Sequence, residues 1–100
     1  MLIAHVKFVV SAQKRIMAIE TLKREVEVVC AMKGCIAFIP FLDPTNPYEV
    51  GVLHEWDTPD DFASYIASDS FATIGQVLRP IMTSPPISKR FDAALIENVH

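Results

Sequence analysis

The chain has 100 residues, the size of one domain, and 51% of them are hydrophobic while 21% are charged. This composition predicts a packed globular protein and excludes intrinsic disorder. The formal net charge of -3 and the scattered Lys and Arg residues exclude the basic stripe that nucleic-acid binding requires. The apolar start, residues 2–10, is far shorter than the ~20 residues of a membrane span and does not resemble an export signal. We therefore expect a cytoplasmic protein without membrane contact.

The first predicted element is a strand over residues 2–10, with one wholly apolar face and one mixed face that carries His5. A helix should follow from Ser11, its N-cap, to Lys33, because apolar residues recur every three or four positions. Gly34 is expected to end this helix in the left-handed conformation.

The second predicted strand, residues 35–42, is apolar on both faces, which indicates that both faces are covered. Pro40 predicts that this strand lies at a sheet edge or carries a bulge, because proline cannot donate to a neighbouring strand. The turn-forming residues 43–47 lead into a third strand over residues 48–56.

A second helical region should begin at Thr58, with Pro59 at the first helical position and Asp61 three residues after the cap. Residues 68–70 predict a break and a second cap. The apolar positions that follow predict another helix, and residues 84–86 should end it before a fourth strand over residues 87–97.

The order β-α-β-β-α-β predicts a single α+β domain over residues 1–100 with a ferredoxin-like, four-stranded antiparallel sheet. Helices can cover only one face of such a sheet, yet the other face retains apolar residues such as Ile3 and Val9. A second copy of the chain, packed sheet against sheet, would cover this face, so we expect a homodimer.

The cysteines Cys30 and Cys35 are expected to be free thiols, since two soft ligands are too few for a structural zinc site. We expect no metal and no cofactor.

Four segments carry a resemblance to a known family: residues 34–35, 54–56, 62–71 and 78–86. In order and spacing they resemble the antibiotic biosynthesis monooxygenase (ABM) domain family of the dimeric α/β-barrel superfamily, over nearly the whole chain. The resemblance implies a dimeric α/β barrel. It leaves the chemistry open, because members include cofactor-free oxygenases of polycyclic aromatic or quinol substrates, haem-degrading enzymes, isomerases of small sugar-like signals and proteins without known activity.

Positions at which this chain departs from the family pattern make some of these activities less suitable than others. Most relatives carry Glu where this chain has His54. The haem-degrading branch has an iron-ligating His where this chain has Gly75, an Asn where it has Val6 and a Trp where it has Tyr65. These differences disfavour haem degradation.

His54 is the candidate catalytic residue, because a neutral imidazole can take a phenolic or quinol proton and the resulting carbanion can pass an electron to oxygen. The alternative is a structural histidine of the sheet. Trp56 and Tyr65 are candidate walls of a substrate pocket, or ordinary core residues. Phe71 and Arg79 complete the candidate substrate-binding set, although Arg79 also suits a surface ion pair. Strand parity directs His5 away from that pocket, towards the dimer face.

The favoured function is a cofactor-independent monooxygenase of a small aromatic, quinol or polyketide-like substrate. The alternative is a non-catalytic module of the same fold that binds a hydrophobic ligand or mediates dimer contacts.

Overall fold

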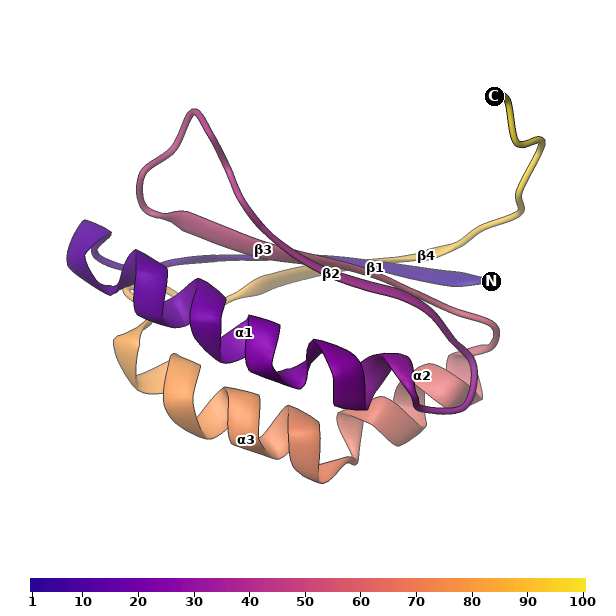
Figure 1. Cartoon of the computed structure of the whole chain (residues 1–100), viewed down its shortest axis with the longest axis horizontal. Helices are drawn as coiled ribbons and strands as arrows, with labels where there is room; N and C mark the ends of the chain where they lie inside the picture. The colour runs from indigo at the N-terminus through magenta and orange to yellow at the C-terminus, as the bar shows by residue number, and fades with distance from the viewer.

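Four antiparallel strands form one sheet, and three helices cover a single face of it (Figure 1). The computed structural model describes all residues, 1–100. The main elements are β1 (Leu2–Val9), α1 (Arg15–Cys30), β2 (Cys35–Leu42), β3 (Glu49–Trp56), α2 (Pro59–Ile66), α3 (Asp69–Leu78) and β4 (Ile87–Asp92). This arrangement confirms the predicted α+β, ferredoxin-like fold.

The strands lie in the order β2-β3-β1-β4, so β2 and β4 are the edges. The edge position predicted from Pro40 is therefore confirmed. A register shift in β2 lies between Cys35 and Ala37, away from the proline. The missing N–H of Pro40 can face the open edge, so the strand needs no bulge at that residue.

Strand pairing sets one row of side chains across the sheet that matters for the site. Phe38 pairs with His54, His54 with Ala4, and Ala4 with Arg90. Phe38, His54 and Ala4 are buried beneath the helices. The row thus places an aromatic, an imidazole, a methyl group and a guanidinium side by side on the helix-covered face.

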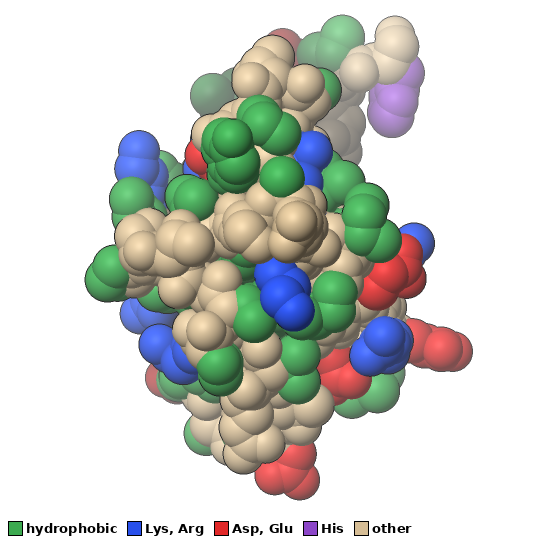
Figure 2. Space-filling model, turned by 90° about the vertical axis from the view of Figure 1, so that its left-hand side faces the viewer, with side chains coloured by type: hydrophobic (Ala, Val, Ile, Leu, Met, Phe, Trp, Pro, Cys, Tyr) green, Lys and Arg blue, Asp and Glu red, His purple; other side chains and the backbone are tan.

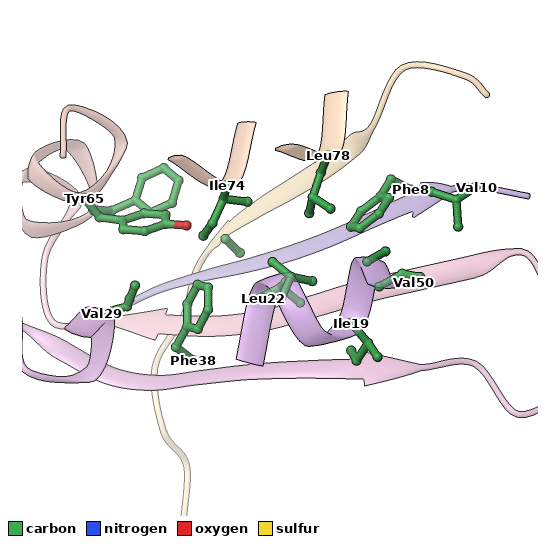
Figure 3. Close-up of a cluster of buried hydrophobic side chains, with 14 of the residues drawn as sticks. Phe8, Val10, Ile19, Leu22, Val29, Phe38, Val50, Tyr65, Ile74 and Leu78 are labelled. Carbon is green, nitrogen blue, oxygen red and sulfur yellow. The ribbon is translucent and has the colours of Figure 1, made fainter. Parts of the chain in front are cut away.

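The helices do not cover the sheet evenly. Helix α1 packs on β2 and β3, and α3 packs beside α1 rather than directly on the strands (Figure 1). Figure 3 shows Ile74 and Leu78 of α3 reaching towards the sheet, opposite Phe8 of β1. The buried apolar core comprises Ala4, Phe8, Val10, Ala18, Ile19, Leu22, Val29, Phe38, Val50, Val52, Trp56, Phe62, Tyr65, Ile74 and Leu78.

The first helix differs at both ends from its prediction. Ser11 precedes a short 3₁₀ turn, Ala12–Lys14, and its side chain caps nothing, while α1 itself ends at Cys30. Gly34 has the expected left-handed backbone, with φ of 81°, but it lies in the turn that opens β2. A Cβ on Gly34 would fall 2.1 Å from the Asp61 carboxylate, so glycine also permits this close approach.

The last strand is shorter than predicted. It ends at Asp92 rather than Glu97, because the backbone bonds between Ala93 and Met1 are the last to hold the chain against β1. Residues 94–100 are exposed and leave the sheet on the side opposite the helices (Figure 1).

Both predicted helix caps of the region after β3 are confirmed. The Thr58 hydroxyl accepts a hydrogen bond from the Asp61 N–H at 3.1 Å. The Ser68 hydroxyl accepts one from the Phe71 N–H at 3.2 Å. These caps fix where α2 and α3 begin, and therefore where their aromatic residues lie.

Both signs of charge occur together on the surface in Figure 2, with hydrophobic side chains between them. No helix of the chain has the length and apolarity needed to cross a membrane.

Replacing the cap tests how α2 is held. Thr58→Ala should lower the free energy of unfolding by about 1 kcal/mol, because the Asp61 N–H loses its partner. Urea unfolding followed by tryptophan fluorescence measures this change. Thr58→Ser retains the hydroxyl and should stay close to wild type; an equal loss in both variants would contradict the capping role.

Candidate functional site

A cavity of about 290 Å³ lies between the helices and the sheet. Its apolar wall is built by residues of both layers: Val6, Phe8, Leu22, Phe38, Val52, Phe62, Ile66, Phe71, Ile74, Leu78 and Met82. His54, Tyr65, Ser88, Arg79 and Arg90 supply its polar side chains. The volume is near the lower end of the ~300–1,000 Å³ typical of small-molecule sites, which suits a small, largely apolar ligand.

His54 is held by Trp56, two residues along the same face of β3. The Trp56 indole Nε1–H donates a hydrogen bond of 2.9 Å to Nδ1 of His54. Both side chains are buried, with 3% of His54 and none of Trp56 exposed. A buried indole N–H usually finds an acceptor, and here the acceptor is the imidazole itself.

This hydrogen bond determines where the imidazole carries its proton. Nδ1 of His54 must be unprotonated to accept from Trp56, so in the neutral ring the proton is on Nε2. The chain supplies no second hydrogen bond to His54, which helps to line the cavity. His54 therefore offers the cavity a neutral N–H donor.

The surroundings of His54 also keep it neutral. Burial, and to a smaller extent the positive charge of Arg90, lower the pKa of His54 to about 4 from its usual 6.5. Phe38, Phe62 and Tyr65 surround the imidazole, with ring centroids 5.5, 5.5 and 5.6 Å away. The base function predicted for His54 needs a free lone pair towards the cavity, and only the opposite tautomer, without the Trp56 bond, provides one.

Tyr65 places a second uncharged donor, its hydroxyl group, beside His54. Its ring stacks on Trp56, with centroids 5.3 Å apart and an angle of 24° between the planes. Burial, with a smaller contribution from the negative charge of Glu25, raises the pKa of the Tyr65 phenol. Figure 3 shows the Tyr65 oxygen pointing into the space between α2, α3 and the sheet. The phenol thus stays protonated and can donate to a ligand.

Two arginines supply the only charged side chains of the cavity lining. The Arg90 guanidinium lies 4.8 Å from the centre of the Phe62 ring, a cation–π contact. Arg79 follows α3 and lies against Gly75, where an added Cβ would come within 3.4 Å of Nε. The two ion pairs of the chain involve Lys7 and Lys23, so neither arginine is paired with a carboxylate.

The structure brings together four of the five predicted site residues. His54, Tyr65, Phe71 and Arg79 all line the cavity. Trp56 does not line it, because its indole lies behind His54 and Tyr65 with no exposed surface. Trp56 is therefore a core residue rather than a wall of the pocket, and its indole contacts the imidazole of His54.

Arg90 and Phe62 were not among the predicted site residues. Alternation along residues 87–91 could have indicated Arg90, since Ser88 and Arg90 share one face while Ile87 and Phe91 share the other. Pairing with Ala4 is what brings Arg90 over the helix-covered face, and sequence alone does not give that register.

The positions that set this chain apart from the haem-degrading branch also face the cavity. Val6 and Gly75 both line it, and neither has a side chain that can ligate iron or donate a hydrogen bond. Val6 and Gly75 therefore give this part of the cavity wall small side chains without polar groups.

Comparisons with known proteins agree with the fold. The family model of the antibiotic biosynthesis monooxygenases matches residues 1–76. A structure of this family from Nitrosomonas europaea has a TM-score of 0.89 and 16% identity, covering 95% of this chain and 100% of its own. One from Deinococcus radiodurans has a TM-score of 0.89 and 17% identity over 100% and 99% of the two chains.

A conserved protein from Methanosarcina mazei, with 23% identity and a TM-score of 0.83, covers 91% of each chain. At these identities the similar structures establish the fold. No curated protein matches the sequence significantly.

The depressed pKa of His54 makes stability depend on pH. Its pKa is about 4 in the folded chain against 6.5 for the free side chain, so the unfolded state binds more protons between these values. The contribution of His54 to the free energy of unfolding should be fully present above pH 6.5 and be lost as the pH falls towards 4. At about 1.4 kcal/mol for each pKa unit, the His54 contribution amounts to about 3 kcal/mol.

An NMR titration of the His54 ring protons, assigned with His54→Asn, measures this directly, and urea unfolding at several pH values follows the stability. A midpoint near 6.5 would contradict the buried, neutral imidazole.

Proposed function

Since this chain belongs to the antibiotic biosynthesis monooxygenase family, we propose that it is a cofactor-independent monooxygenase of a small aromatic, quinol or polyketide-like molecule. The observation that carries the proposal is the group of hydrogen-bond donors that line an apolar cavity: the buried His54 Nε2–H and Tyr65 hydroxyl, and the solvent-exposed guanidinium groups of Arg79 and Arg90. Aromatic walls such as Phe38, Phe62 and Phe71 suit a flat substrate. A cytoplasmic location accords with the two free thiols.

The proposed reaction uses the substrate as the source of electrons. A quinol or anthrone-type substrate SH₂ reacts with O₂ to give SO and H₂O. One oxygen atom enters the substrate, and the substrate's two electrons and two hydrogens reduce the other to water. The electron-rich anion of the substrate is the species that passes the first electron to oxygen. Donors aimed at the substrate oxygen stabilise that anion.

The protein's part in this reaction is binding and electrostatic stabilisation. Because Nε2 of His54 carries a proton, it donates to the substrate oxygen rather than removing a proton from it. Arg79 and Arg90 lower the pKa of a bound phenol by favouring its anion, so water can take the phenolic proton. Phe71, Ile74 and Leu78 exclude water from the apolar end of the ligand.

We also propose that two copies associate through the open sheet face. Side chains of β2, β3, β1 and β4 alternate, and the outward row includes Ile39, Leu53, His5 and Lys89. Ile39, Ile87 and Phe91 are each half-exposed or more, which leaves apolar surface for a partner. His5 contacts Phe41 on this face, with ring centroids 5.9 Å apart, away from the cavity.

Activity is tested with an oxygen electrode and a panel of hydroquinones and anthrones. Wild type should consume one O₂ for each substrate and incorporate one atom of ¹⁸O from ¹⁸O₂. Replacing His54 by Phe should lower kcat about 100-fold, because a donor to the developing oxyanion is lost. His5→Phe, on the opposite face of the sheet, is the matched control and should retain activity.

Trp56→Phe separates a donor role of His54 from the base role predicted from sequence. It releases Nδ1 and permits the other tautomer, so turnover should fall if His54 is a donor and rise if it is a base. If wild type consumes no oxygen with any member of the panel but still binds aromatic compounds, the chain is a ligand-binding module of the same fold.

The dimer is tested by sedimentation at micromolar concentration. Wild type should sediment as two copies, and Ile39→Glu should shift it to a single copy by placing a charge in the apolar face. Val28→Glu introduces the same charge at an exposed valine of α1 and should leave the dimer intact. A wild-type monomer would contradict the proposed association.

A further inference from the structure

Four of the polar side chains that line the cavity are hydrogen-bond donors, which indicates a more specific ligand than an aromatic molecule in general. His54 and Tyr65 are uncharged donors, and Arg79 and Arg90 are cationic donors. No Asp or Glu lines the cavity. His54 and Tyr65 are buried, so a ligand without an acceptor would leave their donors unmatched at a cost, whereas Arg79 and Arg90 are exposed and add positive charge beside the cavity.

Strand pairing places two of these donors in one row across the sheet. His54 and Arg90 both neighbour Ala4, one on each side, on the helix-covered face. With strands about 4.8 Å apart, their Cα atoms are separated by roughly 10 Å. Ala4 itself is fully buried, and the neighbouring row on the same face, formed by Val52, Val6 and Ser88, lines the cavity beside these two donors.

The contacts of Arg90 direct its charge towards the same place. Its guanidinium lies over the Phe62 ring, and the Phe62 and His54 ring centroids are 5.5 Å apart. The Arg90 charge contributes to the lowered pKa of His54, which places the imidazole within the field of the guanidinium. Arg90 Nε also donates to the Ser88 hydroxyl at 3.4 Å, leaving the terminal nitrogens for a ligand.

Arg79 adds a second positive charge from the helix layer. The Arg79 side chain lies against Gly75 of α3, and both residues line the cavity. No carboxylate pairs with either arginine. Two unpaired guanidinium groups beside an apolar cavity are complementary to an apolar body with one anionic end.

We propose that the cavity selects a flat, apolar molecule carrying an oxyanion, a carboxylate or a phenolate, bound with its anionic oxygen towards His54 and Arg90. Arg79 and Arg90 determine the preference for the anion, and His54 Nε2–H supplies a neutral hydrogen bond. This inference rests on the ligand cavity of the proposed function, and names the charge state of the ligand that the cavity takes.

The test compares 2-naphthoate with 2-naphthamide, which share the ring system and differ in charge. Isothermal titration calorimetry at low salt should show naphthoate binding about tenfold or more tightly, as expected for hydrogen bonds to a charged group. Raising the NaCl concentration should weaken naphthoate more than naphthamide.

Variants assign the preference to the arginines. Arg90→Gln and Arg79→Gln should each reduce the naphthoate-to-naphthamide affinity ratio, and the double variant should bring it close to one. Arg90→Lys keeps the charge and should retain part of the preference. Arg24→Gln makes the same change in net charge at an exposed position of α1 and should leave the ratio unchanged.

The outcomes separate the two proposals. If both compounds bind wild type equally, or the double variant keeps the full preference, the anion inference is overturned while the aromatic cavity stands. If neither compound binds wild type, the cavity is not a site for aromatic ligands, and the proposed function fails together with this inference.

Discussion

The hydrogen bond from Trp56 to His54 is the interaction on which the character of the site depends. It uses the one lone pair of a neutral imidazole, at Nδ1, and so leaves a proton on Nε2. Burial among aromatic rings prevents the ring from gaining a second proton near neutral pH. A histidine in this setting has a fixed tautomer and a fixed charge. It can orient and stabilise a ligand oxygen, whereas proton abstraction would require breaking the bond to Trp56.

The fold places donors around a space that the helices leave open. Helix α1 packs directly on β2 and β3, while α3 packs beside α1 and reaches the sheet mainly through Ile74 and Leu78 (Figures 1 and 3). The resulting cavity is lined mainly by apolar side chains, and His54, Tyr65, Arg79 and Arg90 supply its hydrogen-bond donors. An electron-rich aromatic anion is both the ligand that such donors favour and the form of a quinol that reacts with oxygen, so recognition and proposed chemistry depend on the same groups.

Much of the fold could be predicted from local patterns in the sequence. Alternating apolar residues, the caps Thr58 and Ser68 and the edge proline Pro40 are local signals, and the structure confirms each of them. The errors lie at ends of elements that tertiary contacts determine. Strand β4 stops where its pairing with β1 stops, and Gly34 lies where the chain must pass close to Asp61.

The site was harder to predict, because it depends on register and side-chain direction. His54 and Trp56 share a strand face, which the sequence shows, but their hydrogen bond places one at the cavity and the other behind it. Arg90 reaches the site only through its pairing with Ala4. Strand alternation indicates a face, whereas the choice among residues on that face requires the assembled sheet.

The protonation of the two His54 ring nitrogens tests the central claim most directly. A ¹H–¹⁵N correlation experiment on the labelled protein at neutral pH distinguishes a protonated ring nitrogen from an unprotonated one. The bond from Trp56 predicts an unprotonated Nδ1 and a protonated Nε2, lost or mixed in Trp56→Phe. A proton on Nδ1 in the wild type, with Nε2 free, would contradict the donor role and restore His54 as a base.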